Sequence, residues 1–165
     1  MINTGISHLQ SSDQEKLKKA GKRLAAAKTP VEKIKQKEIL ADLLEQNGLH
    51  DDSRILWNEL AQAHHDGLYQ AMCLRKITQS FLNQRDHESA AAKASLALKI
   101  IRQTPLASPA EITEYFQILN QSCFVFYFCN QSDKVDESVK ELRKLFSSID
   151  DLSQQIDFYF SVSLH

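Results

Sequence analysis

The sequence has few of the residues that interrupt helices or cross-link chains. Only four glycines and three prolines occur among its 165 residues, which disfavours the turn-rich pattern of an all-β fold. Its three cysteines, Cys73, Cys123 and Cys129, are odd in number and lie within apolar stretches. They do not form a disulfide framework, which favours a reducing, cytoplasmic location. No secretory signal opens the chain, and no window reaches the roughly eighteen apolar residues of a membrane span.

Neither sign of charge is in excess. Twenty Lys and Arg residues stand against 21 Asp and Glu residues, which gives a formal net charge of -1. No overall electrostatic field therefore attracts nucleic acid or anionic lipid. The basic run from Lys16 to Arg23 could form a phosphate-binding stripe, although a solvated helix face is the simpler explanation. We expect neither nucleic acid nor a membrane as a partner.

Motifs typical of catalysis or cofactor binding are also missing. The sequence contains no phosphate-binding glycine loop, no nucleophile elbow and no His-Glu-x-x-His helix. His64 and His65 are adjacent, and on a helix they would point about 100° apart, so we interpret them as a helix-end pair. Cys123 and Cys129 do not share a helical face, so they do not form a metal-binding pair, and we interpret both as buried thiols of the core. We also assign the phenylalanines and Trp57 to the core. We therefore expect no enzyme activity, no cofactor and no metal ion.

What the chain does contain is a series of helix signals. Three segments carry a capping residue followed three positions later by glutamate: Ser12 with Glu15, Thr29 with Glu32, and Ser108 with Glu111. The last two also have proline directly after the cap. We expect an N-terminal segment with a basic helix over residues 1–28, helical hairpins over 29–149, and an apolar C-terminal helix over 150–165.

The stretch from Phe81 to Arg102 predicts the end of one helix, a tight polar turn and a second helix. Small residues recur in the second helix at Ala90, Ala94 and Ala97, where they allow close approach of a neighbouring helix. The seven apolar residues from Cys123 to Cys129 could by themselves form a strand or a helix. The flanking apolar residues keep helical spacing, and a lone strand would have no partner. We therefore predict a helix there.

The three predicted turns can be aligned with one another. The alignment superposes Leu44, Gly48, Ser53 and Trp57 on Phe81, Arg85, Ala90 and Ala94, and then on Cys129, Asp133, Ser138 and Leu142. This pattern resembles the tetratricopeptide repeat family, although the spacings of 37 and 48 residues exceed the family norm of about 34. The resemblance implies an all-α fold of about seven to eight helices, with antiparallel hairpins stacked as a right-handed superhelix. An unrelated helical bundle is the alternative.

The resemblance also implies a concave groove lined by the first helix of each hairpin. Its predicted peptide-binding residues are Lys35, Glu38, Asp42, Arg75, Gln79, Asn83, Asn120, Tyr127 and Asn130. Further groove positions are Glu45, Gln46, Met72, Leu82, Cys123 and Gln131. Asn and Gln side chains carry both donors and acceptors, which can satisfy the backbone of an extended peptide. The simpler alternative is that these are ordinary solvent-facing residues.

We therefore expect a cytoplasmic adaptor or chaperone-like module that holds a segment of another protein. The alternative is the peptide-sensing effector domain of a bacterial quorum-sensing-type regulator, which has similar irregular repeats. The C-terminal residues include Ile156, Phe158, Tyr159 and Phe160 with almost no charge. One packed surface cannot easily bury all of them, so a homodimer through the C-terminal helix is also expected.

Overall fold

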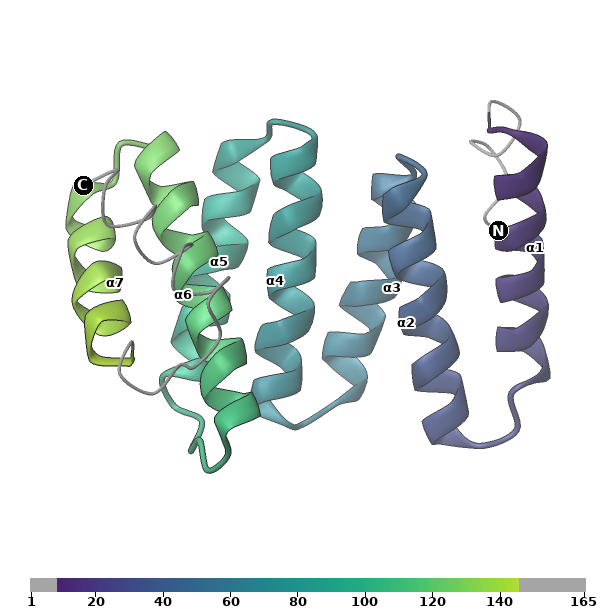
Figure 1. Cartoon of the computed structure of the whole chain (residues 1–165), viewed down its shortest axis with the longest axis horizontal. Helices are drawn as coiled ribbons and strands as arrows, with labels where there is room; N and C mark the ends of the chain where they lie inside the picture. The colour runs from purple at the N-terminus through teal and green to yellow at the C-terminus, as the bar shows by residue number, and fades with distance from the viewer. Residues whose placement is uncertain (1–8, 146–165) are drawn as a thin grey trace. The chain divides into compact units, whose positions relative to one another are not determined.

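The computed structural model describes residues 9–145, and these residues form seven α-helices and no strand (Figure 1). The helices are α1 (Ser11–Ala26), α2 (Pro30–Gln46), α3 (His50–Ala63), α4 (Gly67–Asn83), α5 (His87–Ile101), α6 (Pro109–Phe128) and α7 (Ser132–Leu145). The all-α prediction is confirmed. The predicted C-terminal helix and the dimer that it would form lie outside the described residues.

Side-chain caps fix most of the helix starts. Both predicted proline-containing capping boxes form: the amide of Glu32 donates to Thr29 Oγ1 over 3.1 Å, and the amide of Glu111 donates to Ser108 Oγ over 3.3 Å. Asp66 and Asp86 cap α4 and α5. The predicted box at Ser12 is wrong, because α1 already begins at Ser11 and its N-cap, Gln10, makes no side-chain cap bond.

The chain divides into two compact units, Met1–Ala63 and His64–His165. In the first unit α1 packs on α2, and α2 packs on α3. Leucines from each helix, together with Trp57, form its core; the buried residues include Leu17, Leu40, Leu44, Leu56, Trp57 and Leu60. The prediction that Trp57 is a core residue is confirmed.

In the second unit α4 packs on α5 and α6, α5 packs on α6, and α6 packs on α7. Ala90, Ala94 and Ala97 are all at most 2% exposed, so α5 presents its small residues to neighbouring helices as predicted. The segment from Cys123 to Phe128 is helical, and Cys129 is the C-cap. Phe116 and Phe126 are buried, but the core interpretation is wrong for Phe128, which is 47% exposed.

The three hairpins share one turn geometry. Each turn has one residue with a left-handed backbone: Gly48 (φ 73°), Arg85 (φ 60°) and Asn130 (φ 54°). The next amide closes the turn on the preceding helix, with bonds of 2.9 Å from Leu49 to Leu44, from Asp86 to Phe81 and from Gln131 to Phe126. This is the hydrogen bond from C″ to C3 of a Schellman motif.

This geometry corrects the predicted alignment of the third hairpin. Phe126, not Cys129, is equivalent to Leu44 and Phe81, so the predicted register is three residues too late. The difference arises because α6 ends at Phe128 within the apolar run, so that Asn130, and not Asp133, takes the left-handed turn position. The corrected register superposes buried residues on one another throughout: Ser53, Ala90 and Val135; Trp57, Ala94 and Val139; Leu60, Ala97 and Leu142.

Two negative findings apply to the described part of the chain. None of its helices combines the length and the apolar character needed to cross a membrane. In residues 9–145, no three His, Cys, Asp or Glu side chains are grouped closely enough to hold a metal ion.

Candidate functional site

The corrected register also changes the candidate positions on α6. The positions equivalent to Met72, Arg75, Gln79, Leu82 and Asn83 of α4 are Gln117, Asn120, Phe124, Tyr127 and Phe128. Each of these ten residues is at least partly exposed. The predicted groove residue Cys123, by contrast, is only 2% exposed. Sequence reasoning therefore missed Gln117, Phe124 and Phe128, which the correct turn position at Asn130 would have revealed.

Side chains of α4 and α6 meet along these positions. The Arg75 guanidinium donates two hydrogen bonds to the Glu114 carboxylate, 2.6 and 3.2 Å long. Gln121 Nε2 donates to Gln79 Oε1, and Gln79 Nε2 donates to Asn83 Oδ1, each over 2.9 Å. Three predicted peptide-binding residues, Arg75, Gln79 and Asn83, thus form a ladder of polar contacts with Glu114 and Gln121. We define the α4–α6 face as nine partly or fully exposed residues of the two helices: Arg75, Gln79, Asn83, Gln117, Asn120, Gln121, Phe124, Tyr127 and Phe128.

Aromatic side chains gather at the carboxyl end of α6. The ring centroid of Phe128 lies 4.8 Å from that of Phe124, 5.7 Å from that of Tyr127 and 5.2 Å from that of His87. The first two pairs are edge-on and the His87 pair is stacked, which are favourable arrangements for aromatic rings. The Cys129 thiol donates to the His87 carbonyl over 3.2 Å and holds the start of α5 against this group.

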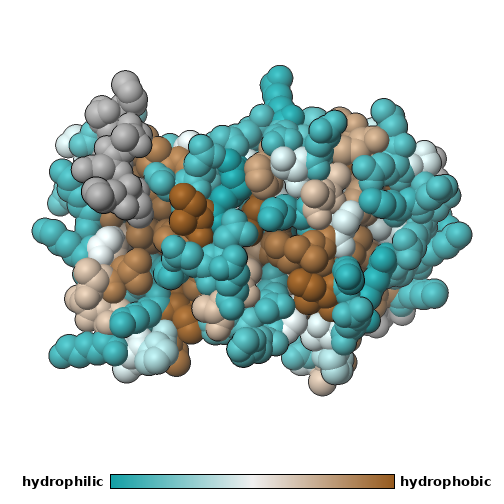
Figure 2. Space-filling model, turned by 180° about the vertical axis from the view of Figure 1, so that it is seen from behind, coloured by the Kyte–Doolittle hydropathy of each residue, from teal (hydrophilic) through white to brown (hydrophobic). Residues whose placement is uncertain are grey.

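This aromatic group is accessible. Tyr127 is 44% exposed and Phe128 is 47% exposed. Other large apolar side chains on the described surface, such as Val31, Ile55 and Leu96, come from separate helices. Seen from behind, the surface is largely hydrophilic, with hydrophobic patches among the hydrophilic residues (Figure 2). Isolated exposed apolar residues are normal, whereas aromatic residues that are both exposed and in mutual contact are typical of binding surfaces.

The predicted contacts on α2 belong to the first unit. Lys35 is exposed, while Glu38 and Asp42 are partly buried. Lys37 bridges α2 to α3 through a 2.8 Å ion pair with Glu59, and His50 Nδ1 lies 2.7 Å from Glu45 Oε1. These residues give α2 a charged face. The predicted role of Lys35, Glu38 and Asp42 in peptide binding stays a prediction. The candidate site of the second unit lies on α4 and α6.

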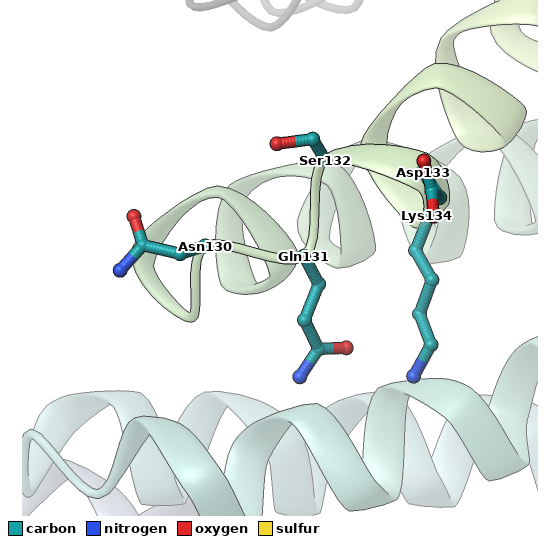
Figure 3. Close-up of a pocket in the computed structure, with 5 residues that line it drawn as sticks. All are labelled: Asn130, Gln131, Ser132, Asp133 and Lys134. Atoms are coloured by element: carbon teal, nitrogen blue, oxygen red, sulfur yellow. The ribbon is translucent and has the colours of Figure 1, made fainter.

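The predicted peptide-binding residue Asn130 lies outside the helices, at the end of the third hairpin's first helix. It forms the turn before α7 and lines an open pocket with Gln131, Ser132, Asp133 and Lys134 (Figure 3). In this view Asn130 and Ser132 point away from the neighbouring helices, whereas Gln131 and Lys134 point toward them. The Lys134 ammonium donates to Ser95 Oγ over 3.3 Å and lies 5.0 Å from the centre of the Phe126 ring. These contacts attach the turn to α5 and α6.

A second polar network joins α5, α6 and α7. Arg102 donates to the Glu141 carboxylate over 2.6 and 3.3 Å and also pairs with Glu137, while the Tyr115 hydroxyl donates to Glu141. Burial, followed by this hydrogen bond, raises the pKa of Tyr115 and keeps its hydroxyl protonated. Arg102 lies just beyond α5, so the network fastens α7 to the rest of the unit.

The buried thiol of Cys123 is unreactive. Burial raises the pKa of Cys123 to about 12, so its thiol stays protonated at neutral pH. A protonated thiol is a poor nucleophile and a poor metal ligand. This agrees with the interpretation of Cys123 as a core residue.

Comparisons with protein families, curated proteins and solved structures give no match to this chain.

Proposed function

We propose that this chain is a protein-interaction module of tetratricopeptide-like architecture, and that its α4–α6 face binds a peptide segment of a partner protein. In this proposal it acts as a cytoplasmic adaptor or chaperone-like protein without catalytic activity. The observation that carries the proposal is the α4–α6 face itself, on which a ladder of amide side chains leads to an exposed aromatic group.

The two parts of this face suit different parts of a bound segment. Side-chain amides can both donate to and accept from the backbone of an extended peptide. Exposed aromatic rings offer a large contact area with few rotatable bonds, so little conformational entropy is lost on binding. The Arg75–Glu114 pair and the Gln79–Gln121 bond join the two helices in advance. Such preorganisation lowers the cost of binding.

Three features support a tetratricopeptide-like architecture. Three helical hairpins follow one another, each closed by the same Schellman turn. Small residues occupy fixed positions of the second helix in the middle hairpin. In the second unit, the first helix of one hairpin contacts both helices of the hairpin before it.

A peptide-display selection on the full chain tests the binding proposal. We expect peptides that bind the wild-type protein and lose at least about tenfold in affinity when Tyr127→Ala and Phe128→Ser are combined, since aromatic contacts at interfaces often contribute more than about 1.4 kcal/mol. The matched control is Ile55→Ser, which also removes an exposed apolar side chain, but from α3. It should leave the affinity unchanged.

Equal affinity for the wild-type protein and the double variant would contradict this proposal. Circular dichroism melting of each variant establishes that the fold is retained.

A further inference from the structure

The charges on the α4–α6 face are already compensated within the protein. Arg75 and Glu114 form a two-pronged ion pair, and the two side chains are 21% and 19% exposed. Lys76, the next residue on α4, is half-buried and has an interaction of its own. The exposed positions of α6 from Gln117 to Phe128 carry amides and aromatic rings and no charge.

Charge is also balanced where the face meets the turn between α4 and α5. Asp86 uses its carboxylate to cap α5, accepting from the Ser89 amide over 3.0 Å. Arg85 and Glu88 contribute one exposed charge of each sign. Beyond the carboxyl end of α6, the Lys134 ammonium contacts Ser95 and the Phe126 ring. The aromatic group is therefore bordered by charges that sum to about zero.

A charged ligand would gain little from such a face. To bind there, a carboxylate or an ammonium group would lose hydration, and it would have to compete with an existing partner for its counter-ion. Loss of hydration without a new ion pair is unfavourable. An aromatic side chain, in contrast, can pack on Tyr127 and Phe128, and an uncharged backbone can bond to the amides.

We infer that the α4–α6 face selects an uncharged, aromatic-bearing segment of its partner protein, rather than an acidic or basic one. This inference rests on the proposed function and specifies the class of ligand. The aromatic residue of the segment contacts Tyr127 and Phe128, and its backbone bonds to Gln79, Asn83 and Asn120.

The peptides selected on the full chain provide the first test. We expect the selected pool to be enriched in Phe, Tyr and Trp and depleted of Asp, Glu, Lys and Arg relative to the starting library. The affinity of the best fluorescein-labelled peptide should change by less than about twofold between about 50 mM and about 500 mM salt, since only charge pairs are screened. Replacing its aromatic residues with alanine should weaken binding at least about tenfold.

A variant that frees one charge provides the second test. Glu114→Gln keeps the shape of the side chain but leaves Arg75 without its carboxylate. We expect this variant to bind a version of the selected peptide carrying two glutamates about twofold to fivefold more tightly than the wild-type protein does. Glu59→Gln, which removes a glutamate from the Lys37–Glu59 ion pair in the first unit, is the matched control and should leave this discrimination unchanged.

The outcomes separate the two proposals. A selected pool rich in acidic or basic residues, or a steep fall in affinity with salt, overturns this inference and leaves the proposed function standing. Both proposals are overturned if the selection yields no binding peptide, or if the selected peptides bind the Tyr127 and Phe128 double variant with the same affinity as the wild-type protein.

Discussion

Helices α2 and α6 occupy equivalent places in their hairpins but present different chemistry. The equivalent positions carry Lys35, Glu38 and Asp42 in α2, and Gln117, Asn120 and Phe124 in α6. Both helices begin with a proline-containing capping box and end in the same Schellman turn. The frame of the hairpin is thus set by its caps, its turn and its buried residues. The exposed face is free to differ, and in this chain it changes from charged residues in α2 to amides and aromatic rings in α6.

The sharpest test of this separation uses two phenylalanines of α6. Phe126 is 1% exposed and occupies the turn position shared with Leu44 and Phe81, whereas Phe128 belongs to the face. We expect Phe126→Ala to lower the free energy of unfolding by about 3–5 kcal/mol and Phe128→Ala by about 1 kcal/mol or less. Urea unfolding followed by circular dichroism measures both.

Circular dichroism is the suitable probe because Trp57, the single tryptophan, lies in the first unit and its fluorescence would report on that unit. Similar losses of unfolding free energy for the two substitutions would show that the exposed residues of α6 contribute as much to stability as its buried residues do.

Local signals made much of the fold predictable. Thr29 and Ser108, each followed by proline and then glutamate, marked their helix starts correctly because a capping box acts within four residues. Ala90, Ala94 and Ala97 identified the packed side of α5 because few other residues permit such close approach. Helix α6 was predictable through Cys123 because flanking residues kept its period.

The register of the third hairpin was not predictable in the same way. Gly48 indicates the first turn in the sequence, because glycine favours a left-handed backbone. Arg85 and Asn130 adopt the same left-handed backbone but are not glycine, so the sequence does not mark their turns in this way. The apolar run to Cys129 conceals where α6 ends, and a shift of three residues keeps nearly the same helical face. That shift placed Cys123, Asn130 and Gln131 in the predicted groove in place of Gln117, Phe124 and Phe128. Partner contacts between side chains, such as Arg75 with Glu114, depend on packing and leave no local signal.

The turns offer a second test, with effects of intermediate size. A Cβ added at Gly48 would have no atom within 4 Å, so the cost of Gly48→Ala comes from its positive φ alone. We expect a loss of about 1 kcal/mol. Arg85→Gly should gain about 0.5–1 kcal/mol because it relieves the same strain. Thermal unfolding measures both changes.

Arg85→Ala is the control for this pair, since it removes the long side chain and keeps the strained backbone. If it stabilises the protein as much as Arg85→Gly does, the gain belongs to the side chain and the turns are not equivalent.

The smallest expected effect concerns the two capping boxes, whose contribution to stability depends on pH. Hydrogen bonds from the Ala107 and Ser108 amides, 2.6 and 2.8 Å long, lower the pKa of Glu111 below its usual 4.5. A carboxyl group with a lower pKa in the folded state stabilises the fold above its unfolded pKa, and this contribution is lost as the pH falls through the folded value. Glu111→Gln should therefore show a smaller drop in melting temperature than the wild-type protein between about pH 6 and about pH 3.

Glu32 has the same two kinds of bond, from the Lys28 and Thr29 amides, so Glu32→Gln should behave alike. A matching response of both variants would show that the first and third hairpins begin in the same way. An acid response of either variant identical to that of the wild-type protein would contradict this account.

The pattern of helix packing has a consequence for how the chain acquires its structure. The strongest contacts join helices that follow one another, and the contact between α4 and α6 skips only one. Contacts between residues that are close in sequence require little loop closure, and proteins dominated by them fold quickly. Each hairpin can therefore form soon after its second helix has been synthesised, before the helices that follow it exist. The aromatic group at the end of α6 forms only once α6 has packed on α5, because Phe128 stacks on His87 at the start of α5.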